Sequence, residues 1–343
     1  MKSGLMRAAA LAAAVVAGGA HAQSSVQLLG TMDAFVGSRR AAGDPGRVTV
    51  VNSGGMTTSW IGFKGTEDLG GGLKANFALT SFLQVDTGQP GRFGGDPMFS
   101  RDANVGLAGG FGAVTIGRAL APNFLPTVIL NPFGDSFTFS PLVLHANVPL
   151  FNGTGWAATT PSDTGWSNEF IYSTPKWGGL SGNVHYQLGE VPGSTGPHNA
   201  GFNVLYFGGP LTAGAFYESA QISNPLPAPF TTGDKKTDWM VGGAYDFTVV
   251  KAFLTYGKVK SDKLVPAART ASLGASVPLG AGSILAGIAR TNVAPASTRR
   301  TTTTIGYDYS MSKSTDVYAM AMHDAITAVS SGNSYGVGIR KRF

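Results

Sequence analysis

The sequence predicts an all-β protein, a transmembrane antiparallel β-barrel of 16 strands with a long third loop folded into the lumen. Three features predict it. The chain opens with an export leader, no later stretch approaches the roughly 20 apolar residues of a membrane-spanning helix, and alternating segments of about ten residues recur to the C-terminus. Lipid offers the backbone no hydrogen-bond partners, so a closed barrel is the remaining way to cross a membrane.

The first 22 residues have the pattern of a signal peptide. Lys2 and Arg7 precede a small, apolar run, and residues 20–22 read Ala-His-Ala, an A-x-A cleavage site. A transmembrane helix is the alternative, but the run of about a dozen residues is shorter than the roughly 20 that span a bilayer. We expect residues 1–22 to be removed and residues 23–343 to form one barrel domain.

Composition narrows the function classes. Charged residues make up 13% of the chain, against roughly 25% in soluble domains. There is no cysteine, which excludes a disulfide framework and a thiolate metal site. The net charge of +6 includes two bases of the leader, and no Lys or Arg run of the nucleic-acid type occurs. The sequence predicts no cofactor, no metal site and no nucleic-acid partner.

Strand-like segments alternate between an apolar and a polar face. From Leu73 to Asp86 the odd-numbered residues, which share one face of the strand, are mainly apolar. At the C-terminus Tyr335, Val337 and Ile339 likewise share a face. This is the apolar-out, polar-in pattern of membrane barrels. A soluble sandwich, whose strands also alternate, is the alternative.

Sixteen strands are expected. Together with their turns and loops they account for the mature length, and a barrel of this size leaves an aqueous channel. Their expected starts lie near Val26, Thr57, Leu73, Met98, Ala113, Ser167, Leu180, Gly201, Leu211, Lys236, Val249, Ala267, Gly282, Thr301, Thr315 and Gly332.

One segment, residues 119–165, interrupts this rhythm. It is rich in proline and shows no convincing strand, and its only ionisable groups are Asp135, His145 and Asp163. Loops of this length in compact folds are usually functional or disordered, and its phenylalanines and leucines argue against disorder. We expect it to fold inward and constrict the pore.

Six sequence blocks resemble the general porins of Gram-negative bacteria, in particular the β-proteobacterial, Burkholderiales-type porins. The resemblance covers most of the mature chain and also includes the terminal Phe. The blocks are Val26-Gln27-Leu28-Leu29-Gly30, residues 61–70 (Ile-Gly-Phe-Lys-Gly-Thr-Glu-Asp-Leu-Gly), 105–109, 111–118, 172–180 and 337–343.

The resemblance implies a homotrimer in the outer membrane, with the third extracellular loop in the pore. It implies passive diffusion of ions and small solutes and no enzymatic activity. It also implies contact with outer-membrane lipid and lipopolysaccharide, and it marks Phe343 as a signal read by the barrel-assembly machinery. Phe343 could equally be an aromatic of the membrane girdle, and both roles are compatible.

In this family a ladder of wall arginines faces acids on the inward loop, and such opposed charges select among solutes. Arg101 and Arg118 match two ladder positions, and Asp135 resembles the acidic turn of the loop. Trp60 and Gly165 stand where the family has two further arginines. We therefore expect a less cationic, more aromatic waist that favours semi-polar or aromatic solutes. The alternative is sequence drift in a channel that is still general.

Alternation also orients single side chains. Trp60, Asp33, Lys64, Lys74 and Glu169 should face the lumen, most of the charged ones as ordinary lumen charges.

The two arginines of the ladder fit the alternation less well. An inward Arg101 would turn Asp102 and Asn104 outward, toward a subunit interface, unless the expected register is wrong. Arg118 shares its parity with Ile116, so a bulge or a strand end must precede it.

Two rival functions remain open. An enzymatic barrel is disfavoured because none of the five histidines lies in a metal or triad motif and Gly-x-Ser-x-Gly is absent. A non-conducting structural or adhesive barrel would have a sealed lumen. Single-channel conductance separates both rivals from a porin.

Overall fold

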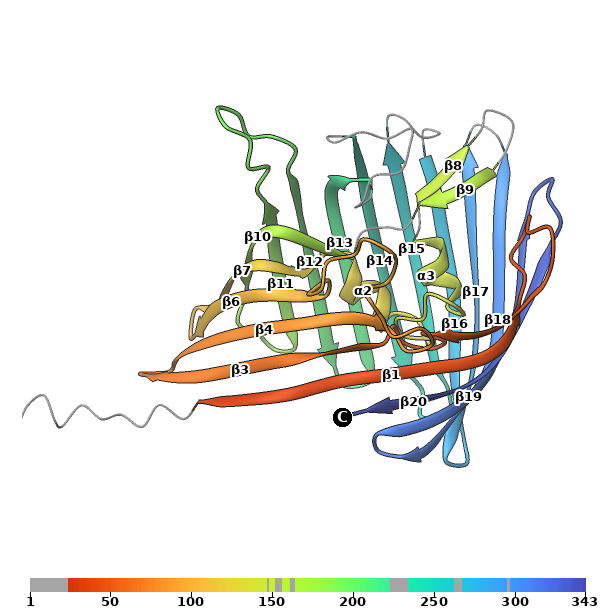
Figure 1. Ribbon diagram of the computed structural model, residues 1–343, viewed down its shortest axis with the longest axis horizontal. Coiled ribbons are helices and arrows are strands. Elements are labelled where there is room, and N and C mark those ends of the chain that lie inside the picture. The colour runs from red at the N-terminus through yellow and green to blue at the C-terminus, as the bar shows by residue number, and fades with distance from the viewer. Residues whose placement is uncertain are drawn as a thin grey trace, which may run out of the picture.

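The computed structural model describes residues 24–146, 148–151, 156–160, 164–222, 234–261, 267–294 and 297–343. The expected signal peptide therefore lies outside the described residues. Nearly all of the described chain is antiparallel sheet that closes on itself as a barrel (Figure 1). No described helix is long and apolar enough to cross a membrane.

The wall has 16 strands, as expected. The sheet has 18 segments, because one wall strand is split into β2 and β3 and because β5 (Gln89–Pro90) is a short piece of a loop. The wall segments are β1 (Ser25–Arg39), β2 (Val48–Ser53), β3 (Trp60–Gly70), β4 (Leu73–Gln84), β6 (Asp102–Gly109), β7 (Gly112–Leu120), β10 (Gly165–Ser173), β11 (Leu180–Gln187), β12 (Asn199–Gly208), β13 (Leu211–Gln221), β14 (Lys235–Asp246), β15 (Lys251–Ser261), β16 (Ala267–Leu279), β17 (Gly282–Ala294), β18 (Thr298–Ser312), β19 (Thr315–Ile326) and β20 (Gly332–Arg342).

The two ends of the chain close the barrel. β1 pairs with β20 from Thr31↔Arg342 to Ser38↔Tyr335, and its other edge pairs with β2 and β3. Beyond the last pair, Gly30 N donates to Phe343 O at 3.0 Å and Phe343 N donates to Gly30 O at 3.1 Å. Closure leaves no exposed sheet edge in the membrane.

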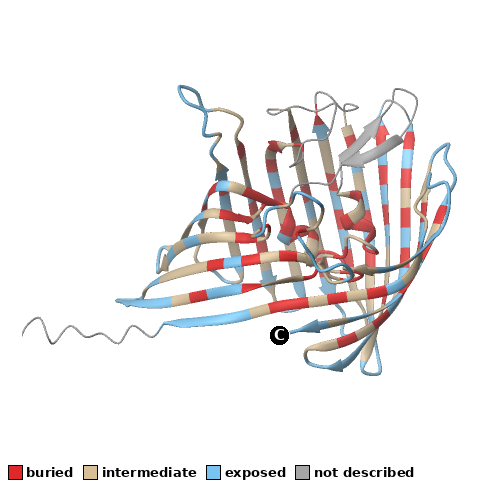
Figure 2. Ribbon diagram, in the orientation of Figure 1, coloured by how far each residue is buried: buried red, intermediate tan, exposed pale blue. Residues whose placement is uncertain are grey.

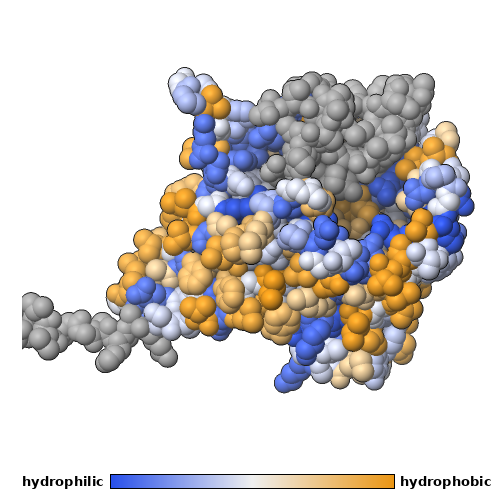
Figure 3. Space-filling view, viewed as in Figure 1, coloured by the Kyte–Doolittle hydropathy of each residue, from blue (hydrophilic) through white to orange (hydrophobic). Residues whose placement is uncertain are grey.

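Side chains alternate around the wall (Figure 2). On β4, Leu79 is 37% exposed whereas its neighbour Thr80 is 0% exposed. On β20, Val337 is 64% exposed while Ser334, of the other parity, is 2% exposed. The exposed residues are mostly apolar and form a hydrophobic outer surface over β1, β3 and β4 (Figure 3). This outer face suits lipid, and the opposite face is the lumen.

The second wall strand is broken between β2 and β3. The sequence did not show this break and predicted one start near Thr57. The backbone leaves the ladder there, and the carboxylate of Asp33 accepts hydrogen bonds from the N–H groups of Gly55, Met56 and Thr57 at 2.8–3.0 Å. Backbone donors outside the ladder need such an acceptor when buried.

The long insertion lies between β7 and β10. It contains two short helices, α2 (Phe124–Ile129) and α3 (Pro141–His145), and a separate pair of strands, β8 (Val148–Phe151) and β9 (Trp156–Thr160). Ser140 caps α3 by accepting from Val143 N, and Pro141 occupies its first turn. Helices this short show no 3.6-residue period, so the sequence pattern missed them.

Candidate functional site: the inserted loop and the pore wall

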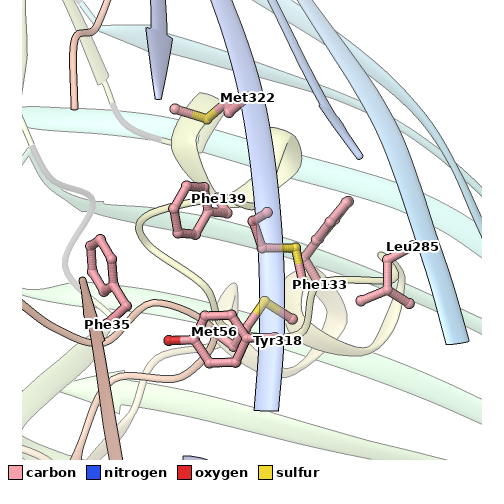
Figure 4. Close-up of a cluster of buried hydrophobic side chains, with 8 residues drawn as sticks. Phe35, Met56, Phe133, Phe139, Leu285, Tyr318 and Met322 are labelled. Atoms are coloured by element: carbon pink, nitrogen blue, oxygen red, sulfur yellow. The ribbon is translucent and has the colours of Figure 1, made fainter. Parts of the chain in front are cut away.

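The inserted loop is held to the wall by an aromatic cluster. Phe133 and Phe139 of the loop are 1% and 0% exposed and pack with Phe35 of β1 and Tyr318 of β19 (Figure 4). The rings of Phe35 and Phe139 meet edge to face with their centroids 5.5 Å apart. Full burial of such rings is among the larger contributions to packing.

A second cluster holds the loop to the neighbouring part of the wall. Leu130, at 0% exposed, packs with Phe216 of β13, Met240 of β14 and Phe253 of β15. These wall residues have the buried parity of their strands. The loop therefore contacts the inner face of the barrel at several strands, and α2 and α3 lie within the ring of strands in Figure 1.

Hydrogen bonds attach the loop at both sides. Ser136 Oγ donates to Gly55 O at 2.6 Å and Thr138 Oγ1 donates to Gly54 O at 2.8 Å, at the break between β2 and β3. At the end of α3, the ring nitrogens of His145 lie 2.7 and 2.8 Å from the hydroxyls of Thr291 and Thr302. Hydrogen bonds to the wall therefore lie on both sides of the hydrophobic contacts of the loop.

His145 and Asp135 are the ionisable groups of the described part of the loop. Burial lowers the pKa of His145, and the nearby charge of Arg300 lowers it further. Burial raises the pKa of Asp135 to about 6, although a hydrogen bond with Thr57 opposes the shift. His145 contacts Thr291 and Thr302 whereas Asp135 contacts Thr57, so the two residues have different partners.

Trp60 faces the lumen side, as alternation predicts, and it is covered by a cation. The guanidinium carbon of Arg101 lies 4.2 Å from the centroid of the Trp60 ring. Arg101 Nη1 is 2.7 Å from Asp102 Oδ2, and Lys64 Nζ is 3.8 Å from the same oxygen. One aromatic ring, two cations and one carboxylate thus form a group on adjacent strands.

Asp102 and Asn104 have the inward parity of β6, so of the two alternatives given above the second holds: the expected register was wrong. Asp102 is 6% exposed and accepts a hydrogen bond from Thr80 Oγ1 at 2.7 Å, and Val105 of the opposite parity is 59% exposed. The strand β6 begins at Asp102. Arg101 precedes the strand, so the alternation of side chains along the strand does not fix the direction of the Arg101 side chain. The expected start near Met98 had placed Arg101 inside the strand.

Arg118 follows a bulge, as its parity requires. Gly117 has a φ of +130°, and the pairing of β7 with β10 shifts register between Trp166 and Glu169. Arg118 Nε donates to Ser100 O at 2.6 Å and Nη1 donates to Ser167 Oγ at 2.9 Å. Because Arg118 is 7% exposed, it braces the wall and presents little charge to the channel.

Gly165 lies against Arg118. A Cβ at this position would sit 3.1 Å from Ala119 O and 3.3 Å from Nη2 of Arg118. An arginine here, as the family resemblance implies, would have to displace the Arg118 side chain. Glycine at position 165 therefore leaves free the space beside the packed side chain of Arg118.

Of the other predicted lumen charges, Glu169 is buried and Lys74 is exposed. Glu169 Oε1 lies 2.5 Å from Nδ1 of His185. Lys74 is near the start of β4 and pairs across the ladder with Ala108, away from the loop. Neither joins the group around Trp60.

Sequence reasoning missed a larger ionic network. Arg340 of β20 pairs with Asp316 at 2.8 Å and Asp308 at 2.9 Å and donates to Thr57 Oγ1 at 2.9 Å. Arg342 pairs with Asp316 at 2.6 Å. Strand parity gave the signal, because all four charged residues share the inner face and lie on consecutive strands, but the sequence did not show the register that sets Asp316 opposite Arg340.

Carboxylates tend to lie beneath the cations that pair with them. In the pair of Lys64 and Asp102 the side chains are 44% and 9% exposed, and in that of Arg342 and Asp316 they are 44% and 5% exposed. The pairs of Arg340 with Asp308, at 11% and 20%, and of Lys236 with Asp238, at 1% and 13%, are exceptions. The surface that solutes meet beside Trp60 is therefore more basic than the residue count suggests. The described residues contain no group of three or more potential ligands for a metal.

Comparison with known proteins agrees with this architecture. Residues 8–326 match the family described as Gram-negative porin. Outer membrane porin protein 32 of Delftia acidovorans is 34% identical over 334 residues, which cover 93% of this chain and 88% of that protein. An outer membrane porin protein of Bordetella pertussis is 27% identical over 405 residues and is covered in full, as is this chain.

Solved structures show the same barrel. An anion-selective porin from Comamonas acidovorans superposes with a TM-score of 0.74 at 26% identity, covering 94% of this chain and 100% of that one. A loop-deletion variant of OmpT of Vibrio cholerae gives a TM-score of 0.66 at 17% identity, which shows the fold alone.

The closed barrel and these matches define the class as a bacterial membrane channel. The chain belongs to the Gram-negative porin family and is an outer-membrane porin. Members of this family are channels rather than enzymes.

Proposed function

We propose that the loop of residues 119–165 forms the constriction of this porin, opposite the wall group of Trp60, Lys64 and Arg101, and that the channel prefers anions. The carrying observation is that Asp102, the one carboxylate of this group, is buried while the Lys64 side chain remains 44% exposed. Fixed charges at a narrow waist act on passing ions at close range, so an exposed cation over a buried acid favours anions.

The ring of Trp60 adds a preference for a type of solute to this proposal. Arg101 stacks on one face of the ring, which holds the guanidinium in place over an apolar platform. Such a surface suits solutes that carry a negative group next to a flat or apolar part. This extends the expectation of an aromatic waist, while the cations make it less neutral than expected. The anion-selective porin of Comamonas acidovorans supports the same preference.

Single-channel recording with a salt gradient across a planar bilayer tests the proposal. The wild type should show a reversal potential of the anion-preferring sign. Lys64→Gln and Arg101→Gln should each shift it toward cations, since each removes a charge at the waist. Lys176→Gln removes an exposed charge in the turn after β10 and should leave it unchanged. A reversal potential that is the same in the wild type, Lys64→Gln and Arg101→Gln would reject the site.

Trp60→Arg tests the aromatic part separately. It would place a second guanidinium beside Arg101, so anion preference should rise while blockade by aromatic anions should fall. Equal blockade of wild type and variant would leave Trp60 without a role in selectivity.

The family resemblance and the apolar outer surface support three further proposals: a homotrimer, an export signal and an assembly signal. The apolar outer face of β1, β3 and β4 suits a homotrimer interface, and residues 1–22 suit an export signal. Phe343 suits recognition by the barrel-assembly machinery. Absence of conductance from the folded barrel would instead favour the structural, adhesive or enzymatic readings.

A further inference from the structure

Basic side chains gather on the outer surface of β15 to β18, near the ends that carry the longer loops. They share their strand parity with exposed apolar residues such as Leu254, Leu273, Ile288 and Ile305, which are 40–61% exposed. They are therefore on the outside of the barrel. We call this set the outer basic band; its members are Lys258, Lys260, Arg269, Arg290 and Arg299.

Strand register brings these cations together. Lys258 lies directly across the ladder from Arg269, and Arg269 lies across from Asn292, which in turn faces Arg299. Arg290 is two residues before Asn292 on the same strand. Directly opposed residues on one face have Cβ atoms about 4.5–5.5 Å apart, and like charges placed so destabilise the sheet. The outer basic band thus needs a counter-charge.

The described protein does not supply one. Among the described residues, no member of the outer basic band makes an ion pair. By alternation, the only acid at an outward strand position of the described wall is Glu67, which lies toward the short-turn end of β3. A second copy therefore offers no acidic strand face to cover the band.

The same region lacks the aromatic side chains found on both sides of it. Tyr217, Trp239 and Tyr256 face outward on β13 to β15, and Tyr335 does so on β20. The long-loop ends of β16 to β19 carry no outward Phe, Tyr or Trp. An aromatic girdle marks the membrane interface, so its replacement by cations indicates a different, anionic neighbour at this height.

We propose that the outer basic band binds the phosphate groups of a phosphorylated lipid in the outer leaflet. The band lies at the end with the longer loops, which faces the cell exterior in outer-membrane barrels. Guanidinium groups bind phosphate oxygens in pairs, and lysine adds point charge. The inference rests on the outer-membrane location and is independent of the anion preference proposed for the channel.

Lipid binding to the refolded full-length mature porin in detergent tests this. The probes are a bis-phosphorylated glucosamine lipid and the same lipid with its phosphates removed. The wild type should bind the phosphorylated form about tenfold or more tightly, a difference worth roughly 1.4 kcal/mol. The double variant Lys258→Gln/Arg269→Gln should lose most of that ratio. The control Lys176→Gln/Lys313→Gln removes the same charge from exposed turns at the other end and should keep it.

Each outcome decides the matter. An unchanged ratio in the band variant, an equal loss in the control, or full competition by inorganic phosphate would overturn a lipid site. If the double variant fails to fold, the single variant Arg290→Gln replaces it, with heat-dependent gel mobility as the check of folding. Conductance of the same variants should match that of the wild type. A wild-type porin that binds the phosphorylated lipid but shows no anion preference would contradict the channel proposal alone.

Discussion

Asp33 shows how much one inward residue can organise. Its buried carboxylate, 0% exposed, accepts three backbone hydrogen bonds from the break between β2 and β3 and a fourth from the hydroxyl of Tyr318. The same break receives Ser136 of the inserted loop. Asp33 thereby positions the wall segment on which the loop rests.

Asp33→Ala should destabilise the folded barrel by several kcal/mol, because each buried donor left without an acceptor costs about 1–3 kcal/mol. Tyr318→Phe removes one of the four donors and should cost about 1 kcal/mol. Unfolding by urea, followed as loss of the folded gel mobility, measures both. Equal midpoints for wild type and Asp33→Ala would show that the break is held by other contacts.

At this scale alternation predicted an inward orientation for Asp33, Trp60 and Glu169. In the structure Asp33 and Glu169 are buried and the ring of Trp60 lies under Arg101. It failed for Asp102 because Arg101 was taken as an inward residue of the strand, although it precedes β6. An orientation that is fixed on a residue outside the strand can reverse every side chain of the strand. The partners of Arg340 depended on the register between neighbouring strands, which the sequence pattern did not give.

At the scale of elements, the inserted loop is a separate body fastened inside the wall. Its length and its break from the rhythm of the wall strands could be predicted from the sequence. The expectation that it contains no strand was wrong, because β8 and β9 pair with each other inside it. Its anchors could not, because Phe133, Phe139 and Leu130 meet residues of strands far away in the sequence. Contacts of this kind depend on how the barrel closes.

The fastening of α3 should depend on pH. The pKa of His145 is lowered in the folded state, so the neutral ring is favoured and its contribution is complete above the ordinary pKa of about 6.5. That contribution is lost progressively as the pH falls below about 6.5, since the unfolded state then binds more protons. We expect more frequent closures or current noise in this range.

His145→Gln keeps a polar contact to the threonines but cannot titrate, so it should reduce this pH dependence. Asp135, with its pKa raised to about 6, acts in the opposite sense: its contribution is present at low pH and is lost as the pH rises through about 6. Recording Asp135→Asn beside His145→Gln separates the two. Closures that persist unchanged in His145→Gln would assign the effect elsewhere.

For the whole molecule, closure involves the last residue of the chain. Phe343 exchanges two backbone hydrogen bonds with Gly30, and its ring covers the space where a Cβ of Gly30 would lie. The fold class, the strand number and most strand starts followed from the sequence, since period-two alternation and turn residues recur along it. The resemblance at the C-terminus also indicated the importance of the final residue.

Deletion of Phe343 should lower the yield of folded barrel in cells, because it removes the two closing hydrogen bonds with Gly30. We expect a loss of about tenfold, which corresponds to roughly 1.4 kcal/mol in an equilibrium. Phe343→Tyr keeps an aromatic ring and should restore most of it. Heat-dependent gel mobility of outer-membrane fractions measures the yield. In vitro refolding of the deletion variant distinguishes loss of the closing bonds from loss of a cellular signal, because only the former would slow refolding without the assembly machinery.

The attachment points of the loop have a mechanical consequence. They run along the inner face from β13 through β14, β15, β17, β18 and β19 to β1 and the break between β2 and β3, so the loop follows a large part of the ring. A hollow cylinder resists flattening poorly, whereas one that is braced from within keeps its cross-section better under lateral pressure. The loop of this porin is such an inner brace. Variation in membrane tension should therefore change the bore less than it would in a barrel whose loop contacts only one or two strands.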